Sequence, residues 1–177
     1  MSPPLWWGFL LRRFMEIRSG FLYHIKDSFF DDVKDHTLMS NKEGGSYRPH
    51  FLAIQDTQNS EIFWMVPVSS KFSKYKKIYE SQIRKYKKCT KIVLGKCGGW
   101  DAAYLIQNAF PIIPDYFDHI HISQGQALTI HDTTQKRIMK NLNYNLRLHK
   151  RDVSLFFADI DRIYTLMETL INKRKAI

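Results

Sequence analysis

The sequence predicts an α+β fold, in which strands and helices contribute to one domain. Residues 48–56 and 61–68 are nearly all apolar and flank a short polar turn, which predicts two paired strands in a sheet centre or a barrel wall. Residues 153–171 repeat apolar side chains at helical intervals, which predicts a long amphipathic helix. The chain has 177 residues and shows no internal repeat or linker, so it fits a single domain with a substantial core.

The elements that precede the paired strands are short. Residues 20–25 predict a first strand, and Asp27 is expected to cap a helix that ends near Lys34. Residues 35–46 are polar and end in two glycines, which predicts a loop.

A basic helix is predicted after the second strand, over residues 71–88. Its apolar residues recur at steps of three and four, the spacing of one helix face, at Phe72, Tyr75, Tyr79, Ile83 and Tyr86. Between Lys71 and Lys91 there are nine basic residues and one acid, Glu80. Solvation is the ordinary role of lysines on a helix, but here almost no acid is available for pairing along the helix.

The second half of the chain is predicted to alternate strands, turns and helices. The expected elements are a strand at 91–95, a turn at 97–99, a strand or short helix at 102–109, an extended apolar edge at 110–114 and a helix from Asp132 to about Leu148. Asp152 is expected to cap the last helix, whose basic end at 173–175 suits the helix dipole.

The overall charge favours a polyanionic partner. Lys and Arg number 27 against 17 acids, which gives a net charge of +10 and a pI near 9.6. Nucleic acid is the first candidate for such a protein, and an anionic membrane surface is the second.

The first residues are expected to lie outside the domain. Residues 5–11 are apolar but too short to span a membrane, and Arg12 and Arg13 follow the apolar run, whereas a signal peptide carries its charge before it. We therefore expect residues 1–14 to be an extension or a misplaced start, and residues 15–177 to form the domain. The two cysteines, Cys89 and Cys97, have no zinc-ligand spacing, and a reducing cytoplasm is the simplest location.

Two stretches that flank the paired strands carry side chains suited to phosphodiester chemistry. Tyr47, Arg48 and His50 lie at the start of the first strand. The second strand ends in two hydroxyls and an ammonium group, at Ser69, Ser70 and Lys71. This set can hold a phosphate, donate hydrogen bonds to it and move a proton, and it contains no carboxylate that would repel the phosphate. It predicts RNA cleavage without a metal or other cofactor, through attack of the ribose 2′-oxygen on the adjacent phosphorus.

Each assignment has a simpler alternative. A histidine on a strand is often a core residue, and a serine before a helix is often only a cap. His119 and His121 alternate on an expected strand and hint at a metal, but no third ligand has a suitable spacing. The whole protein could instead be a non-catalytic nucleic-acid-binding module, or a membrane-surface protein that uses residues 5–14 and its lysines.

The order of these features resembles the endoribonuclease toxins of type III toxin–antitoxin systems, the ToxN, AbiQ and CptN group. The resemblance covers roughly residues 16–172 and is carried by four short stretches in order: 21–26, 47–50, 64–71 and 110–114. The CptN branch is the most similar, because Lys71 directly follows Ser69 and Ser70.

The resemblance implies a MazF-like fold, a small and highly twisted antiparallel β-barrel with added helices. It also implies cleavage of A-rich single-stranded cellular or phage mRNA to 2′,3′-cyclic phosphate ends, and inhibition by a repeated RNA pseudoknot in a toxin–RNA hetero-oligomer. The catalytic positions that carry over are Tyr47, His50, Ser69, Ser70 and Lys71.

The resemblance departs from the family at Phe29, where ToxN has a tyrosine, so His50 or Tyr23 would have to replace that hydroxyl. The residues expected to contact the RNA backbone are Arg48, Lys74, Lys76, Lys77, Arg84, Lys85 and Lys88. Tyrosines on the same helix, such as Tyr79, could stack bases.

Overall fold

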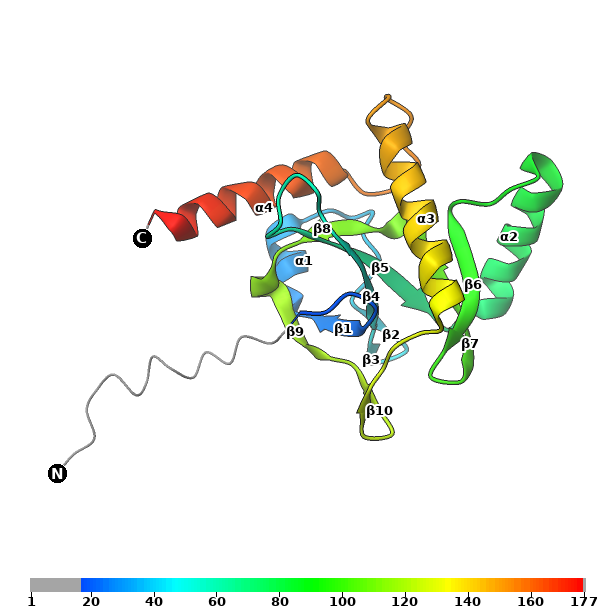
Figure 1. The fold of residues 1–177 in the computed structure, drawn as a ribbon. Helices are drawn as coiled ribbons and strands as arrows, with labels where there is room; N and C mark the ends of the chain where they lie inside the picture. The colour runs from blue at the N-terminus through cyan, green and yellow to red at the C-terminus, as the bar shows by residue number, and fades with distance from the viewer. Residues whose placement is uncertain (1–16, 177) are drawn as a thin grey trace.

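A seven-stranded antiparallel sheet forms the centre of the molecule (Figure 1). The structure is a computed structural model and describes residues 17–176. The strands are β1 (Leu22–Ile25), β4 (His50–Gln55), β5 (Phe63–Ser69), β6 (Ile92–Cys97), β7 (Trp100–Leu105), β8 (Phe110–Ile112) and β9 (Phe117–Ile120). They are ordered β6-β7-β5-β4-β1-β9, and β8 pairs with β5. The predicted α+β class is confirmed, whereas the closed barrel stays a prediction.

Strands β4 and β5 lie inside this sheet, as their apolar sequences predicted. They pair in antiparallel register from Gln55–Phe63 to His50–Pro67, with an irregularity after Leu52. The other edge of β5 is shared, because its first half pairs with β8 and its last two residues pair with β7. Both edges of β5 are therefore paired, and six of its seven residues are buried.

Two small hairpins stand apart from the sheet. One joins β2 (Lys42–Glu43) to β3 (Ser46–Tyr47), and the other joins β10 (Ile122–Ser123) to β11 (Gln126–Ala127). In the first, the turn residues Gly44 and Gly45 have φ angles of 58° and 84°. Residues with a side chain rarely adopt such backbone angles, which explains why two glycines occupy this turn. The predicted loop over 35–46 thus contains the start of a hairpin.

Residues 17–176 contain four α-helices, which pack against the sheet or extend from it. They are α1 (Asp27–Val33), α2 (Phe72–Tyr86), α3 (Asp132–His149) and α4 (Ile160–Lys175), and 3-10 turns occur at Ile106–Asn108 and Pro114–Tyr116. Helix α3 packs on β4 and β6, and α4 packs on β8. Residues 102–109, predicted as a strand or a short helix, form the end of β7 and a 3-10 turn.

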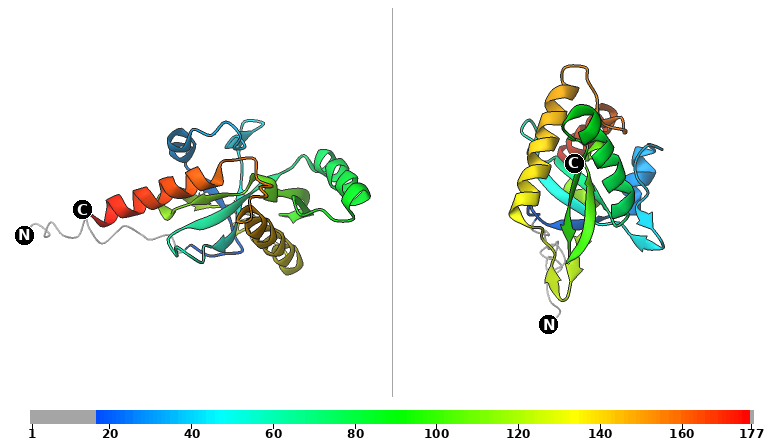
Figure 2. Two further views of the ribbon diagram at one scale, coloured as in Figure 1. Left: turned by 90° about the horizontal axis from the view of Figure 1, so that it is seen from above. Right: turned by 90° about the vertical axis from the view of Figure 1, so that its right-hand side faces the viewer.

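Helix α2 projects away from the body of the protein (Figure 2). It contacts β6 and β7, and its predicted apolar face is only partly covered. Tyr75 is the helix's buried residue, whereas Tyr86 is 53% exposed. The helical period was read correctly, but the β6–β7 ribbon covers little more than the first turns of this face.

The last helix begins seven residues later than predicted. Asp152 has a positive φ of 60° and caps no helix. Asp159 is the true N-cap, and its Oδ1 accepts a hydrogen bond from the backbone N–H of Arg162 at 3.1 Å. The apolar residues before it are used otherwise: the Phe156 ring packs beside the Trp64 ring, and the backbone N–H of Phe157 donates to the Gln107 carbonyl.

The predicted extension over residues 1–14 lies outside the described residues. Within residues 17–176, none of the helices has the length and apolar character that a membrane crossing requires.

Candidate active site

The pairing of β4 with β5 brings the two predicted stretches together. Because the strands run antiparallel, the segment that precedes His50 lies beside the segment that follows Pro67. The backbone N–H of Val68 donates to the Pro49 carbonyl at 3.2 Å, which extends this contact beyond the strand. Tyr47 and Arg48 therefore lie close to the end of β5, where the two serines and Lys71 follow.

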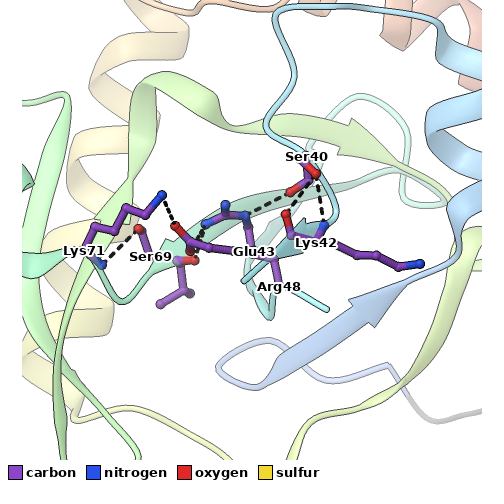
Figure 3. Close-up of polar contacts among 7 residues, drawn as sticks. Ser40, Lys42, Glu43, Arg48, Ser69 and Lys71 are labelled. Carbon is purple, nitrogen blue, oxygen red and sulfur yellow. Dashed lines mark hydrogen bonds and ion pairs between the residues drawn. The ribbon is translucent and has the colours of Figure 1, made fainter. Parts of the chain in front are cut away.

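Tyr47, Arg48, Ser69, Ser70 and Lys71 form one cluster, and a carboxylate that the sequence did not predict lies between its two cations. Glu43, in the β2–β3 hairpin, accepts a hydrogen bond from Arg48 Nη1 through Oε2 at 3.0 Å, and its Oε1 lies 3.1 Å from Lys71 Nζ (Figure 3). The expectation that no carboxylate is present was wrong. Glu43 belongs to a polar stretch in which only the glycine pair signals a turn, so its sequence context gave little reason to single it out.

Arg48 is a structural residue of this cluster and not a free phosphate clamp. Its side chain is 5% exposed. Nε donates to the Ser40 carbonyl at 3.1 Å, and Nη1 donates to the Val68 carbonyl at 3.0 Å as well as to Glu43. These bonds occupy the donors that would form two parallel bonds to a phosphate. They also fix Glu43 against the end of β5, so Arg48 is corrected from an RNA ligand to a positioning residue.

At the end of β5, Ser69 faces inward, whereas the two residues that follow it, Ser70 and Lys71, face solvent. Ser69 is 1% exposed, and its Oγ accepts a hydrogen bond from the backbone N–H of Lys71 at 3.3 Å. It therefore makes a hydrogen bond within the local turn and is not part of the open surface. Ser70 is exposed, and the Lys71 side chain is 61% exposed, so both can reach a ligand.

Tyr47 joins the cluster from β3. Its ring is 45% exposed, and its hydroxyl donates to Asp27 Oδ2 at 2.9 Å. Hydrogen bonds from Asn41 and then from Tyr47 lower the pKa of Asp27, so the carboxylate stays ionised and keeps the phenol oriented.

A pocket of about 260 Å³ opens beside these groups. Its walls come from the β2–β3 hairpin, the start of β4, the end of β5 and the β6–β7 turn. Besides Glu43, Tyr47, Arg48 and Ser70, the lining residues are Ser46, Pro49, Val68, Cys97, Trp100, Asp101 and Ala102. The pocket thus combines two carboxylates, hydroxyls and aromatic rings, with the Lys71 ammonium bound to its Glu43 and the Lys96 ammonium bound to its Asp101.

His50 does not face this pocket, contrary to the prediction. It is fully buried, and its ring packs edge-on against Phe110 with centroids 5.5 Å apart. Neither ring nitrogen makes a hydrogen bond of normal geometry within the described chain. Burial, followed by the charges of Arg48 and His24, lowers its pKa to about 3, against a smaller opposite effect of the Arg48 backbone. His50 is therefore corrected from a catalytic acid or base to a neutral core residue.

Tyr23, the other residue expected to replace the hydroxyl that Phe29 lacks, is also unsuitable. Phe29 is buried and stacks on Phe110 at 4.9 Å. Tyr23 is fully buried, and its hydroxyl donates to the Arg18 carbonyl and accepts from the Arg18 N–H. Tyr47 lines the pocket, but its hydroxyl is bonded to Asp27, which is not among the residues that line it.

The burial of His50 predicts an acid-sensitive fold. Its pKa is about 3 in the folded protein and 6.5 ordinarily, so the unfolded chain binds the proton more tightly. Stability is then fully present above pH 6.5, and the unfolding free energy falls by about 1.4 kcal/mol per pH unit as pH drops toward the folded value. In urea unfolding across this window, His50→Leu should flatten the slope, whereas exposed His36→Ala should leave it unchanged. Equal slopes in wild type and His50→Leu would contradict this account.

The basic side chains predicted to contact RNA are exposed along α2. They are Lys74, Lys76, Lys77, Arg84, Lys85 and Lys88. The helix starts directly after Lys71, close to Ser70 of the pocket, and projects away from the body of the protein (Figure 2). Near its C-terminal end, Lys88 Nζ donates to the Tyr144 hydroxyl at 3.0 Å, which links this surface to α3.

The histidines that hinted at a metal gather with a third one. His24 Nε2 lies 2.7 Å from His121 Nδ1, and the His24 ring stacks on His119 with centroids 4.5 Å apart. Burial and then the neighbouring imidazoles lower the pKa of His24 to about 4. Among residues 17–176, no group of three or more His, Cys, Asp or Glu side chains is arranged to hold a metal ion.

Comparison with known proteins gives a fold relationship. No protein-family model matches the sequence, and no curated protein matches it. Among solved structures, the chain is similar to AbiQ, described as a lactococcal anti-phage endoribonuclease belonging to the type-III toxin-antitoxin system. The TM-score is 0.66 with 11% sequence identity, over 88% of this chain and 99% of AbiQ. At this identity the likeness shows a shared fold.

Proposed function

We propose that this chain is an endoribonuclease toxin of a type III toxin–antitoxin system. One observation carries the proposal: on a fold shared with an endoribonuclease, Glu43, Lys71 and Ser70 converge beside an exposed aromatic pocket. A base, a cation and a hydroxyl are the minimum that phosphodiester transfer by a ribose 2′-oxygen requires.

The first step is an exchange of ion pairs. A substrate phosphate competes with Glu43 for the exposed ammonium group of Lys71, and Ser70 donates its hydroxyl to a phosphoryl oxygen. Glu43 stays in place because Arg48 holds its other oxygen at 3.0 Å. Oε1 is then free to accept a proton.

The chemical step follows at the freed carboxylate. Glu43 Oε1 takes the proton of the ribose 2′-hydroxyl, and the 2′-oxygen attacks phosphorus as the bond to the 5′-oxygen breaks. Lys71 stabilises the charge on the phosphoryl oxygens. Once its hydroxyl has left Asp27 Oδ2, Tyr47 gives its phenolic proton to the leaving 5′-oxygen, so the products are a 2′,3′-cyclic phosphate and a free 5′-hydroxyl.

The finer features of the proposal rest on the sequence resemblance. The substrate is A-rich single-stranded mRNA of the cell or of a phage in the cytoplasm, and the inhibitor is a repeated RNA pseudoknot held in a toxin–RNA assembly. The basic face of α2, which begins at the pocket, provides a track for the RNA backbone. Membership of the CptN branch rests on the Ser69-Ser70-Lys71 order.

Purified protein is expected to cleave A-rich RNA in the presence of EDTA, because Lys71 supplies the positive charge that a metal would otherwise provide. The products should carry cyclic phosphate ends, which end-labelled RNA resolves on a denaturing gel. Loss of cleavage with chelator would exclude this metal-free mechanism. RNA that is retained on a native gel but never shortened would instead support the non-catalytic binding module, which the exposed basic face of α2 also suits.

A further inference from the structure

Trp100 is far more exposed than an apolar side chain of its size usually is. It is the first residue of β7, and 81% of its surface is accessible. Tryptophan is usually well buried, because its large apolar surface gains from leaving water. An exposed tryptophan therefore has a cost in the free protein that a bound partner can offset.

The backbone holds Trp100 firmly at this position. Gly98 and Gly99 form the two-residue turn between β6 and β7, with φ angles of 57° and 87°. Positive φ at both positions is the requirement of the tight turn that matches strand twist. Trp100 then pairs with Cys97, at the start of an unbroken antiparallel ladder between the two strands. The ring is thus carried on a rigid ribbon and not on a loose loop.

Trp100 lines the 260 Å³ pocket described above, and a second exposed aromatic ring lines this pocket from a different hairpin. Tyr47, at the end of the β2–β3 hairpin, is 45% exposed and lines the pocket together with Trp100. Ser70 lines it as well, and the Glu43 carboxylate that lines it is paired with Lys71. Two aromatic rings therefore lie beside the groups that would bind a phosphate.

We infer that Trp100 and Tyr47 form a nucleobase-binding subsite, in which Trp100 stacks on a base next to the phosphate held by Lys71. This inference rests on the proposed function. RNA fits the combination better than a protein segment does, since a base has a planar face for the rings and its phosphate suits the adjacent cation. The pocket volume, about 260 Å³, is smaller than that of sites for drug-sized ligands, which suits one base.

Binding of a short RNA with a single 2′-deoxy residue at the cleavage position tests the subsite, because this RNA can bind but lacks the attacking hydroxyl. Trp100→Ala should weaken binding about tenfold or more, the usual effect of losing one stacked base. Trp100→Phe should restore most of the affinity, since a smaller ring still stacks. Phe157→Ala removes another exposed ring, 57% accessible, before α4 and should change nothing.

A series of abasic substitutions locates the contact. In wild type, removing the base at one position should weaken binding, and in Trp100→Ala the same removal should have no further effect. Equal affinity of wild type and Trp100→Ala, or equal losses from the abasic position in both, would overturn the inference.

The same protein preparations separate this inference from the proposed function. If the all-ribose RNA is cleaved normally while Trp100→Ala leaves both binding and KM unchanged, the subsite fails and the nuclease stands. If affinity depends on Trp100 but the all-ribose RNA is never cleaved, the nuclease fails and the base contact stands.

Discussion

Glu43→Gln is expected to lower kcat/KM for RNA cleavage by about 10²- to 10⁴-fold, the usual contribution of a general base. The amide has nearly the same shape, and its oxygen can still accept the bond from Arg48 Nη1. What the substitution removes is the ability to take the 2′-proton. Initial rates on an A-rich RNA, together with the thermal midpoint, distinguish lost chemistry from lost folding.

A second acidic residue provides the control for this prediction. Glu80→Gln, which alters the exposed acid of α2, is the matched control and should retain wild-type rates. Full activity in Glu43→Gln would mean that Glu43 only holds Lys71 and that another group takes the proton.

Lys71→Met should reduce kcat by about 10²- to 10³-fold, as removal of one charge-stabilising group usually does. The ammonium group is expected to act on charge that develops in the transition state, so kcat should fall more than KM rises. Lys71→Arg, which keeps the charge with another shape, should recover part of the rate. Single-turnover measurements at saturating RNA report this change directly.

An exposed lysine at the far end of α4 provides the control for this prediction. Lys173→Met removes the same charge and should leave cleavage unchanged. If the two variants lose activity equally, the effect is general electrostatic attraction of RNA and Lys71 has no special role. If Lys71→Met raises only KM, Lys71 binds substrate without acting in the chemical step.

Features with a clear local pattern could be predicted from the sequence. Strands β4 and β5 were evident from their apolar runs and intervening turn, and their antiparallel pairing brings Tyr47 close to Ser70 and Lys71. Helix α2 followed from its apolar period, and α3 followed from the pattern of Asp132 and Gln135 at its start. Each of these features depends on neighbours in the chain, and local spacing was enough to reveal it.

The errors involve properties that depend on distant residues. A central strand is apolar on both faces, so the sequence could not tell that His50 points toward Phe110 instead of toward the pocket. The two-residue strands of the β2–β3 hairpin are too short for a period, which hid Glu43. The exposure of Trp100 depends on what the rest of the fold leaves uncovered, and residue type alone would have placed it in the core.

The small size of the β2–β3 hairpin has a consequence for how the protein responds to heat. Its two strands form a ribbon separate from the seven-stranded sheet, and this ribbon carries Glu43 and Tyr47. Peripheral units of this kind open with less free energy than the core requires. Warming would then release the Glu43 carboxylate and the Tyr47 phenol while the remaining structure persists. Cleavage activity would therefore be lost at a lower temperature than the one at which the domain unfolds.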